Sequence, residues 1–405
     1  MAETLYPGTV GRCTEKELMN YNHPVRNDST MAVKAVCAVV LLSFSFLWLY
    51  FFQADTMYLA QHVLSGGRTH YSRLGGALLL TLLMWLLQLV VYRIVKLRRT
   101  SHALTWLPSM LLLAVLSSAG ADFDRHPGFG HWWWAAPLVL VVWALIVWVA
   151  KMVQPYETDN RSFHVLRRLW INLLTAAILM AGVAATSNTN AVFHFRTHAE
   201  VAMVHGDFDE ALRVGHRSLE TDSSLVMVRM YALSRKGLLT DRLFEYPVVA
   251  SSDVMLPTRG GDVRLAVYPV DSLYRHLGAI PRRPMRPIDY LQTIIRNGQA
   301  KAAAVDYLLC GYLIDCRLDS FARALPRYYT VNDSLPRYYR EALVLYNHRH
   351  SHPHVVYHDP VLDVDYRDMR KMMGACRDNN ERRVKMLENY AGSYWSYYDY
   401  NTRLR

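Results

Sequence analysis

The stretch WWAAPLVLVVWALIVWVAKMV, residues 133–153, decides the class of this protein, because it is apolar except for Lys151 near its end. A helix needs about 20 consecutive apolar residues to cross the hydrocarbon core of a membrane. Four further stretches meet this requirement, at residues 31–53, 74–94, 103–121 and 169–187. We therefore predict an N-terminal block of about five transmembrane helices, spanning residues 31–187.

The interior of this block is poor in polar side chains. None of the five stretches carries an ionised residue near its middle, and the polar exceptions are Gln88 and Asn172. Channels, pumps and proton relays place ionisable side chains inside the bilayer. The composition therefore argues against a transport function.

Charge is distributed unevenly along the 405 residues. Of the 34 acidic residues, nine lie in positions 1–190 and the other 25 follow, so a membrane half precedes a soluble half. The net charge of +11 comes largely from short loops beside the apolar stretches, where basic residues set orientation. No nucleic-acid-binding signature is present, so we expect membrane lipids and no nucleic acid as partners.

Basic residues also predict the orientation of the chain. They gather in the N-terminal tail, residues 1–30, and in the loops after the second and fourth stretches: Arg12, Lys16, Arg26, Arg93, Lys96, Arg98, Arg99, Lys151, Arg161, Arg167 and Arg168. The other two loops hold only Arg68, Arg73 and Arg125. Loops rich in Lys and Arg stay in the cytoplasm. The tail is therefore predicted to be cytoplasmic, and five crossings place residues 191–405 on the opposite side.

The soluble half reads as short amphipathic helices. The run AEVAMVHGDFDEALRVGHRSLETDSSL, Ala199–Leu225, resembles a tetratricopeptide repeat, with Gly206 in the turn, Phe208 after it, and Ala211 and Ser218 on the second helix. Weaker helix pairs follow at Val226–Phe244, at Ala303–Tyr329 and from Leu335. We predict an all-α, TPR-like α-solenoid over 191–405, with an irregular all-α domain as the alternative. A Pro- and Gly-rich connector with one short helix is expected at 248–288.

Three segments resemble a family of uncharacterised bacterial envelope proteins: LYRHLGAIP at 273–281, AAAVDYLLCGYLIDCRLDSFARALPRYY at 302–329 and SLPRYYREALVLY at 334–346. The resemblance spans the chain and is most specific from about 271 to 346. It implies an N-terminal membrane block with a TPR-like C-terminal domain, a multi-pass position in the bacterial inner membrane, and a periplasmic C-terminal domain. It implies no reaction and no functional residues.

A histidine-rich segment is the first candidate site. It contains His348, His350, His352, His354 and His358. Imidazole nitrogens suit Zn, Cu or Ni, but the spacing defines no tetrahedral set and Pro353 indicates a loop. The interpretation we favour is a solvated loop without a metal.

The loop between the third and fourth stretches is the second candidate site. Its sequence DFDRHPGFGHWWW supplies Asp122, Asp124, Arg125, His126 and His131. Membrane enzymes can place such acid and histidine sets at an interface. Pro127 with its neighbouring glycines is equally typical of an ordinary turn, and the turn is the interpretation we favour.

Other catalytic and cofactor signatures are missing from the sequence. It contains no GxSxG, HExxH, Walker A, CxxC or dinucleotide fingerprint, so no cofactor is expected. The cysteines are Cys13, Cys37, Cys310, Cys316 and Cys376, too few for a disulfide scaffold. Buried thiols are the expected state of Cys310 and Cys316.

Aromatic residues crowd the C-terminus. Tyr390, Tyr394, Trp395 and Tyr398 lie within YAGSYWSYYDY, residues 390–400, and the tyrosines recur at helical spacing. Such spacing usually marks a packed face, and the alternative is a docking surface for a partner.

Two classes of function remain open at this point. The first is a non-enzymatic adaptor whose helical domain binds another envelope protein, in assembly, secretion or envelope biogenesis. The alternative is a membrane enzyme acting on a lipid or glycan, with the third loop as its site. A weaker third possibility is a metal-responsive sensor that uses the histidine-rich segment.

Overall fold

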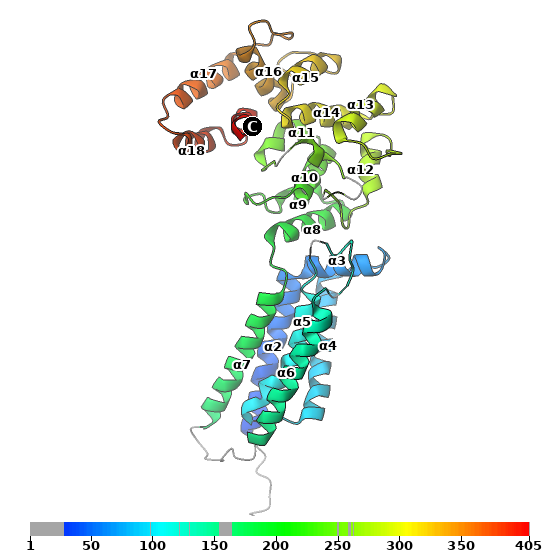
Figure 1. Ribbon diagram of the computed structural model, residues 1–405, viewed down its shortest axis with the longest axis vertical. Coiled ribbons are helices and arrows are strands. Elements are labelled where there is room, and N and C mark those ends of the chain that lie inside the picture. The colour runs from blue at the N-terminus through cyan, green and yellow to red at the C-terminus, as the bar shows by residue number, and fades with distance from the viewer. Residues whose placement is uncertain are drawn as a thin grey trace, which may run out of the picture. The chain divides into compact units, whose positions relative to one another are not determined.

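The computed structural model describes residues 28–97, 99–120, 122–128, 130–153, 164–248, 251–257, 261 and 263–404. Most of the predicted N-terminal tail, residues 1–27, lies outside the described residues, as do Arg98 and Arg161. Every regular element in the described part is a helix, so the predicted all-α class is confirmed (Figure 1).

The chain divides into two compact units. Unit 1 comprises Met1–Phe51, Arg73–Ser118 and Phe129–Ser187. Unit 2 comprises Phe52–Ser72, Ala119–Gly128 and Asn188–Arg405. Two loops that interrupt the apolar stretches therefore belong to the same unit as the C-terminal half.

Unit 1 contains the apolar helices. These are α2 (Asp28–Leu47), continued by η1 (Trp48–Phe52), α4 (Arg73–Val95), η2 (Arg99–Trp106), α5 (Leu107–Leu116), α6 (Trp132–Val153) and α7 (His164–Thr186). Neighbours in this set pack along their lengths (Figure 1). Many leucine, valine and tryptophan side chains on α4 and α6 remain exposed, as expected for a surface that meets lipid.

Four helices of the described residues are long and apolar enough to cross a membrane: Met31–Phe52, Arg73–Val95, Trp132–Val153 and Leu166–Thr186. The stretch predicted at 103–121 is a shorter apolar helix, Thr100–Leu116. It ends early because Ser117 and Ser118 follow, and the Ser118 hydroxyl donates to the carbonyl of Val115 at 2.7 Å. This bond satisfies one of the carbonyl groups that a helix leaves open at its C-terminus.

Pro108 marks the change from the 3-10 geometry of η2 to the α-helical geometry of α5. Proline has no N–H, so it cannot donate to the carbonyl of Leu104 four residues earlier. The indole Nε1 of Trp143, on α6, donates to that oxygen at 2.8 Å instead. A helix from another part of the block therefore supplies the donor that proline removes.

Polar side chains tie the interior of unit 1. Asn172 accepts from the backbone N–H of Ala103 at 2.7 Å, and Gln88 donates to the Thr105 hydroxyl at 3.2 Å. In an apolar block such bonds fix helices against each other. The two polar exceptions noted in the sequence therefore serve packing.

Unit 2 is a succession of short helices. They are α3 (Ala54–Leu64), α8 (Ala191–Val204), α9 (Phe208–Arg213), α10 (Ser223–Lys236), α11 (Leu239–Arg242), η4 (Leu243–Glu245), η5 (Ser252–Met255), α12 (Val270–Leu277), α13 (Pro287–Arg296), α14 (Ala302–Ile314), α15 (Leu318–Ala324), η6 (Leu325–Arg327), α16 (Arg337–Arg349), α17 (Pro360–Gly374), α18 (Asn379–Tyr390) and α19 (Tyr394–Leu404). From α8 to α19 most helices pack on their neighbours in sequence (Figure 1). One continuous apolar core runs through them.

The turns between paired helices share one backbone geometry. Gly206 (φ +78°), Gly237 (φ +68°) and Cys316 (φ +57°) occupy the left-handed region directly before α9, α11 and α15. The N–H of the next residue in each turn bonds back to the preceding helix, as from Asp207 to Ala202 at 2.9 Å and from Arg317 to Tyr312 at 2.8 Å. This pattern is a Schellman motif, which ends a helix and reverses the chain.

One expected feature of the first pair is wrong. Ser218, expected on the second helix, lies beyond it, because α9 ends at Arg213. Gly215 follows in the left-handed region (φ +61°), and a Cβ there would lie 2.8 Å from the ring of Phe195. The chain must therefore leave the helix before Ser218. Ala211 does lie buried on α9, as expected.

Cys316 is the non-glycine member of the three turns, and this leads to a stability prediction. Replacing Cys316 with glycine should raise the free energy of unfolding by about 0.5–1 kcal/mol, because a side chain costs energy in the left-handed region. Thermal unfolding of the full-length protein in mild detergent measures the change. Cys316→Ala keeps the Cβ and should bring no gain, and an equal gain in both variants would contradict this explanation.

Candidate functional site

The loop proposed as a catalytic site is tied to the C-terminal half. Arg264 Nη2 lies 2.6 Å from Asp122 Oδ1, and Arg264 Nε lies 3.0 Å from Asp124 Oδ2. Arg125 donates to the carbonyl of Gly261. The hydrogen bond from Arg264 lowers the pKa of Asp122, because it stabilises the ionised carboxylate. The two acidic side chains of this loop therefore form ion pairs with Arg264.

The two histidines of the same proposed set take no part in this cluster. His126 is exposed, and its ring makes no hydrogen bond or ion pair among the described residues. His131 belongs to unit 1, where its ring stacks near Trp132 at 5.2 Å. The structure thus brings Asp122 and Asp124 together with Arg264 and does not bring either histidine to them.

The contacts of Arg264 lead to a prediction about how firmly this loop is held. Replacing Arg264 with glutamine should free residues 119–128, with a loss of about 1.5–3 kcal/mol because a hydrogen bond to a charged group is worth that much. Hydrogen exchange of the full-length protein should show faster exchange in this loop. Arg213→Gln, in an exposed pair with Glu210, should change little. An unchanged rate of hydrogen exchange in the Arg264 variant would contradict the role of Arg264 in holding this loop.

Residues 52–72, the other loop that interrupts the apolar stretches, also contact the C-terminal half within unit 2. His198 Nδ1 lies 3.0 Å from Asp55 Oδ1 of α3, and its Nε2 lies 3.7 Å from Glu210 Oε1 of α9. Gln53 donates to the carbonyl of Asn188 at 3.1 Å, and Asn188 donates to that of Ala119 at 2.9 Å. Apart from His198 and Glu210, the partners are more than 60 residues apart, so no local sequence signal marks these contacts.

The histidine-rich segment lies against carboxylates of two helices. His348 and His358 lie 3.2 and 3.4 Å from Asp363 of α17, and His350 lies 3.1 Å from Asp319 of α15. His352 and His354 do not join them in a common cluster: the described residues hold no group of three or more His, Cys, Asp or Glu arranged to bind a metal. The segment therefore connects α15, α16 and α17 through these side-chain contacts.

The C-terminal aromatic residues lie mainly inside the core. Tyr394, Trp395 and Tyr398 are buried, and Tyr390 is half-buried. The indole of Trp395 donates to the carbonyl of Glu341 at 2.8 Å, and the backbone N–H of Tyr394 donates to the Glu341 carboxylate at 2.7 Å. Of the two alternatives considered for these residues, this is the packed arrangement.

A buried polar cluster lies at α14. Asp306 accepts from the hydroxyls of Tyr329 at 2.6 Å and Tyr339 at 3.1 Å. Burial raises the pKa of Asp306, and it raises the pKa of the Cys310 thiol well above its usual value. A thiol that stays protonated is a poor nucleophile. Among the described residues, Cys37, Cys310, Cys316 and Cys376 form no disulfide.

The crevice beside Arg229 is the candidate site that sequence reasoning missed. Arg229 sits in the middle of α10, where every residue from Ser224 to Leu233 is buried. A charged side chain on such a helix cannot reach solvent, and only 1% of Arg229 is exposed. An arginine this buried is normally paired with a carboxylate. The signal was visible as a lone arginine within the apolar run LVMVRMYAL, residues 225–233.

Arg229 has few partners. Its Nη2 donates to the carbonyl of Gly215 at 3.1 Å, and its guanidinium carbon lies 5.2 Å from the ring centre of Tyr246. Its Nε and Nη1 have no hydrogen-bond acceptor among the described residues. Burial lowers the pKa of Arg229, and the electrostatic effects of Tyr246 and Asp222 oppose that change. The guanidinium is a cation whose desolvation is only partly compensated.

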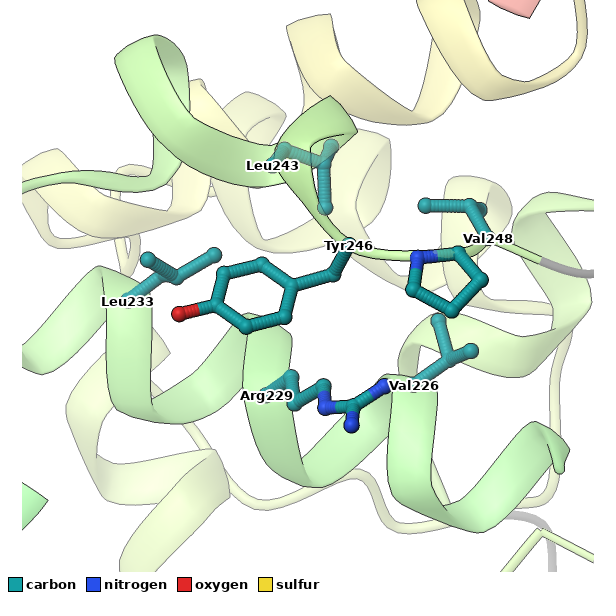
Figure 2. Close-up of a pocket in the computed structure, with 7 residues that line it drawn as sticks. Val226, Arg229, Leu233, Leu243, Tyr246 and Val248 are labelled. Carbon is teal, nitrogen blue, oxygen red and sulfur yellow. The ribbon is translucent and has the colours of Figure 1, made fainter. Parts of the chain in front are cut away.

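The surroundings of the guanidinium form a narrow, apolar crevice. Figure 2 shows the side chain between α10 and the segment 243–248, beneath the ring of Tyr246. Its lining is Val226, Arg229, Leu233, Leu243, Tyr246, Pro247 and Val248. The side chains nearly fill the crevice and leave almost no free volume inside it, so the buried guanidinium is closed off from solvent.

Comparison with known proteins gives one match. Residues 285–401 match a family of unknown function, DUF6057. The expected resemblance to an uncharacterised family is confirmed to that extent, and two of the three segments that suggested it lie within the match. No curated protein matches the chain, and no solved structure does.

Proposed function

We propose that this protein is a membrane-anchored adaptor whose helical C-terminal domain binds another envelope protein. Unit 1 is the anchor, and unit 2 presents the binding surfaces. The setting is the bacterial inner membrane, with the N-terminus in the cytoplasm and unit 2 in the periplasm. The role lies in assembly, secretion or envelope biogenesis.

The composition of unit 2 supports five crossings. Residues 52–72, 119–128 and 188–405 share this compact unit, and a compact unit lies on one side of a membrane. In this proposal the chain crosses twice between 72 and 119, through Thr100–Leu116 as well as through Arg73–Val95. The basic loops then favour a cytoplasmic N-terminus.

Reporter fusions test this topology. A reporter fused after Arg405 should be active only outside the cytoplasm, and one fused at Thr100 only within it, because an odd number of crossings separates the N-terminus from unit 2. Alkaline phosphatase and green fluorescent protein activities measure the two positions. Finding both fusion points on one side would contradict five crossings.

The succession of helices supports a TPR-like surface. Paired helices joined by left-handed turns at Gly206, Gly237 and Cys316 stack in order along the chain. Stacks of this kind expose extended faces on which peptides or helices of other proteins dock.

The pairing of Asp122 and Asp124 with Arg264 is the observation that favours the adaptor over the alternative, a membrane enzyme. An enzyme with the third loop as its site needs free carboxylates near a histidine. Both carboxylates lie on Arg264 instead, at 2.6 and 3.0 Å. In this arrangement residues 119–128 are held within unit 2 by Arg264, which suits a scaffold.

Purification of the full-length protein from native membranes in mild detergent tests the proposal. We expect a second protein at fixed stoichiometry, measured by native mass spectrometry, and we expect Asp122→Asn to retain it because Asp124 still holds Arg264. The enzyme gains support if a lipid or glycolipid is the sole stoichiometric companion, and if Asp122→Asn abolishes the cellular role while the protein remains folded and inserted.

A further inference from the structure

The loop that connects α12 to α13 concentrates positive charge (Figure 1). It contains the segment AIPRRPMRP, residues 279–287. From residue 275 to residue 301 the chain has six Lys or Arg side chains and a single carboxylate, that of Asp289. All six cations are exposed, and together they form what we call the basic loop surface: Arg275, Arg282, Arg283, Arg286, Arg296 and Lys301.

The cations of the basic loop surface have no carboxylate partner among the described residues. Lys301 Nζ donates to a backbone oxygen, the carbonyl of Arg275, at 2.8 Å. Cations on other helices of unit 2 lie within 3.2 Å of a carboxylate oxygen, as do those of Arg213, Lys236, Arg242, Arg337, Lys371, Arg382 and Lys385. Clustered charges of one sign create a local potential that attracts ligands of the opposite sign. The basic loop surface is therefore suited to an anionic ligand.

The backbone of this loop has little freedom. Pro281, Pro284 and Pro287 each have a fixed φ angle. The Tyr290 hydroxyl donates to the carbonyl of Ala279 at 2.5 Å, which holds the start of the loop against α13. Ordering a flexible loop opposes binding. A loop that is already ordered avoids much of this cost.

Two apolar side chains accompany the positive charge. Ile280 and Met285, which lie on either side of Arg282 and Arg283 in the sequence, are each 43% exposed. Methionine is flexible and polarisable, and it adapts to apolar partners of different shape. A ligand that matches this surface therefore combines several negative charges with a few apolar side chains.

Three classes of anionic ligand differ in what they require. Five of the six cations are arginines, whose planar guanidinium groups bind carboxylates through two parallel hydrogen bonds. A segment that lies in a membrane surface needs a broad apolar face, whereas Ile280 and Met285 are the two large apolar side chains that this loop exposes. Single-stranded nucleic acid stacks its bases on aromatic rings, and the segment 279–287 contains no aromatic residue. These features favour an acidic protein segment.

We propose that the basic loop surface binds an acidic segment of a partner protein, in which Asp or Glu side chains flank one or two apolar residues. This inference rests on the proposed adaptor role and names the chemistry of the segment that unit 2 recognises. Arg282, Arg283 and Arg286 pair with the carboxylates, and Ile280 and Met285 contact the apolar side chains.

Peptide binding to the full-length protein in mild detergent tests the assignment. The probe is a fluorescein-labelled peptide of eight residues in which glutamate alternates with leucine, compared with the same peptide carrying glutamine in place of every glutamate. Fluorescence anisotropy should show about tenfold tighter binding of the glutamate peptide, because the contributions of several exposed ion pairs add together. Its affinity should fall as the salt concentration rises, since salt screens exposed charges.

Two triple variants with the same change in net charge provide the control. The loop variant carries Arg282→Gln, Arg283→Gln and Arg286→Gln. It should bind the glutamate peptide about tenfold more weakly than wild type, because three ion pairs are lost. The control variant carries Arg213→Gln, Lys236→Gln and Lys371→Gln, and should bind like wild type because its changes lie outside the loop. All six positions are exposed, so both variants should keep the thermal midpoint of wild type.

Met285→Gln tests the apolar part of the surface separately. It should weaken binding of the glutamate peptide about two- to fivefold, because an apolar contact is lost. The salt dependence of binding should stay as in wild type, since no charge changes. An affinity equal to that of wild type would contradict the assigned role of Met285.

Several other results would overturn the assignment. Equal affinity for the glutamate and glutamine peptides would do so, as would equal losses in the loop and control variants. Tighter binding of dihexanoyl phosphatidylglycerol or of oligothymidylate than of the glutamate peptide would assign the surface to lipid or nucleic acid instead. Co-purification from native membranes separates this inference from the adaptor role. If wild type and the loop variant retain a partner equally, the loop assignment alone fails, and if wild type retains none, the adaptor role fails.

Discussion

Replacing Glu200 with alanine should lower the free energy of unfolding of unit 2 by about 3–5 kcal/mol, the cost of removing one member of a buried charge pair. Glu200 is fully buried on α8, and its Oε2 accepts the backbone N–H groups of Ala266, Val267 and Tyr268 at 2.8, 2.7 and 3.1 Å. Its Oε1 lies 3.8 Å from Arg196 Nε. Alanine would leave three N–H donors, that of Val267 buried and the other two part-buried, without this acceptor and would remove a charge partner of Arg196.

Denaturant unfolding of the full-length protein in mild detergent, followed by pulse proteolysis of residues 188–405, measures this loss. Glu200→Gln retains an oxygen for the three N–H groups and removes only the charge, so its loss should be about half as large. Glu220→Ala changes an exposed carboxylate and should shift stability by less than about 0.5 kcal/mol. An alanine variant at position 200 as stable as the Glu220 variant would contradict the role of Glu200 in fastening the 263–268 segment.

Replacing Gly278 with alanine should cost roughly 3 kcal/mol, because backbone strain and a steric overlap add up. Gly278 ends α12 at φ +150° and ψ −90°, and a Cβ there would collide with the carbonyl oxygen of Gln299. The close approach is held by the N–H of Lys301, which donates to the carbonyl of Leu277 at 2.9 Å. A backbone atom cannot move aside as a side chain can.

Gly298→Ala is the matched control for the overlap. Gly298 also has a positive φ of +68°, but a Cβ there meets nothing within 4 Å. It should cost only about 1–2 kcal/mol from the left-handed conformation. Thermal unfolding of both variants in the same detergent separates the two contributions. Equal losses at positions 278 and 298 would show that the contact with Gln299 adds nothing.

Local patterns were sufficient for much of the secondary structure. The turn at Gly206 and the meeting of helices near Asp315 follow from side-chain size and backbone freedom over a few residues. The end of α9 at Arg213 was harder to predict, because it depends on Gly215 packing against Phe195 of the previous helix.

The candidate site was much less predictable than the helices. In sequence, the acid and histidine residues of the third loop offered a catalytic site as the alternative to an ordinary turn, and nothing local indicates the contact with Arg264 some 140 residues later. In sequence Arg229 stands out only as a lone charge within the apolar run 225–233. The burial of its guanidinium follows from the packing of α10 on all sides, which depends on distant segments.

The sequence by itself determined that this protein has apolar helices long enough for a membrane, followed by a helical half, because hydrophobic length and periodicity are properties of contiguous residues. Only the tertiary structure decided that residues 52–72 and 119–128 fold with the C-terminal half, that Asp122 and Asp124 share Arg264, and that Arg229 Nε and Nη1 meet no acceptor within the described part of the chain. These features depend on which distant segments meet, and ion pairs and burial are set by that meeting.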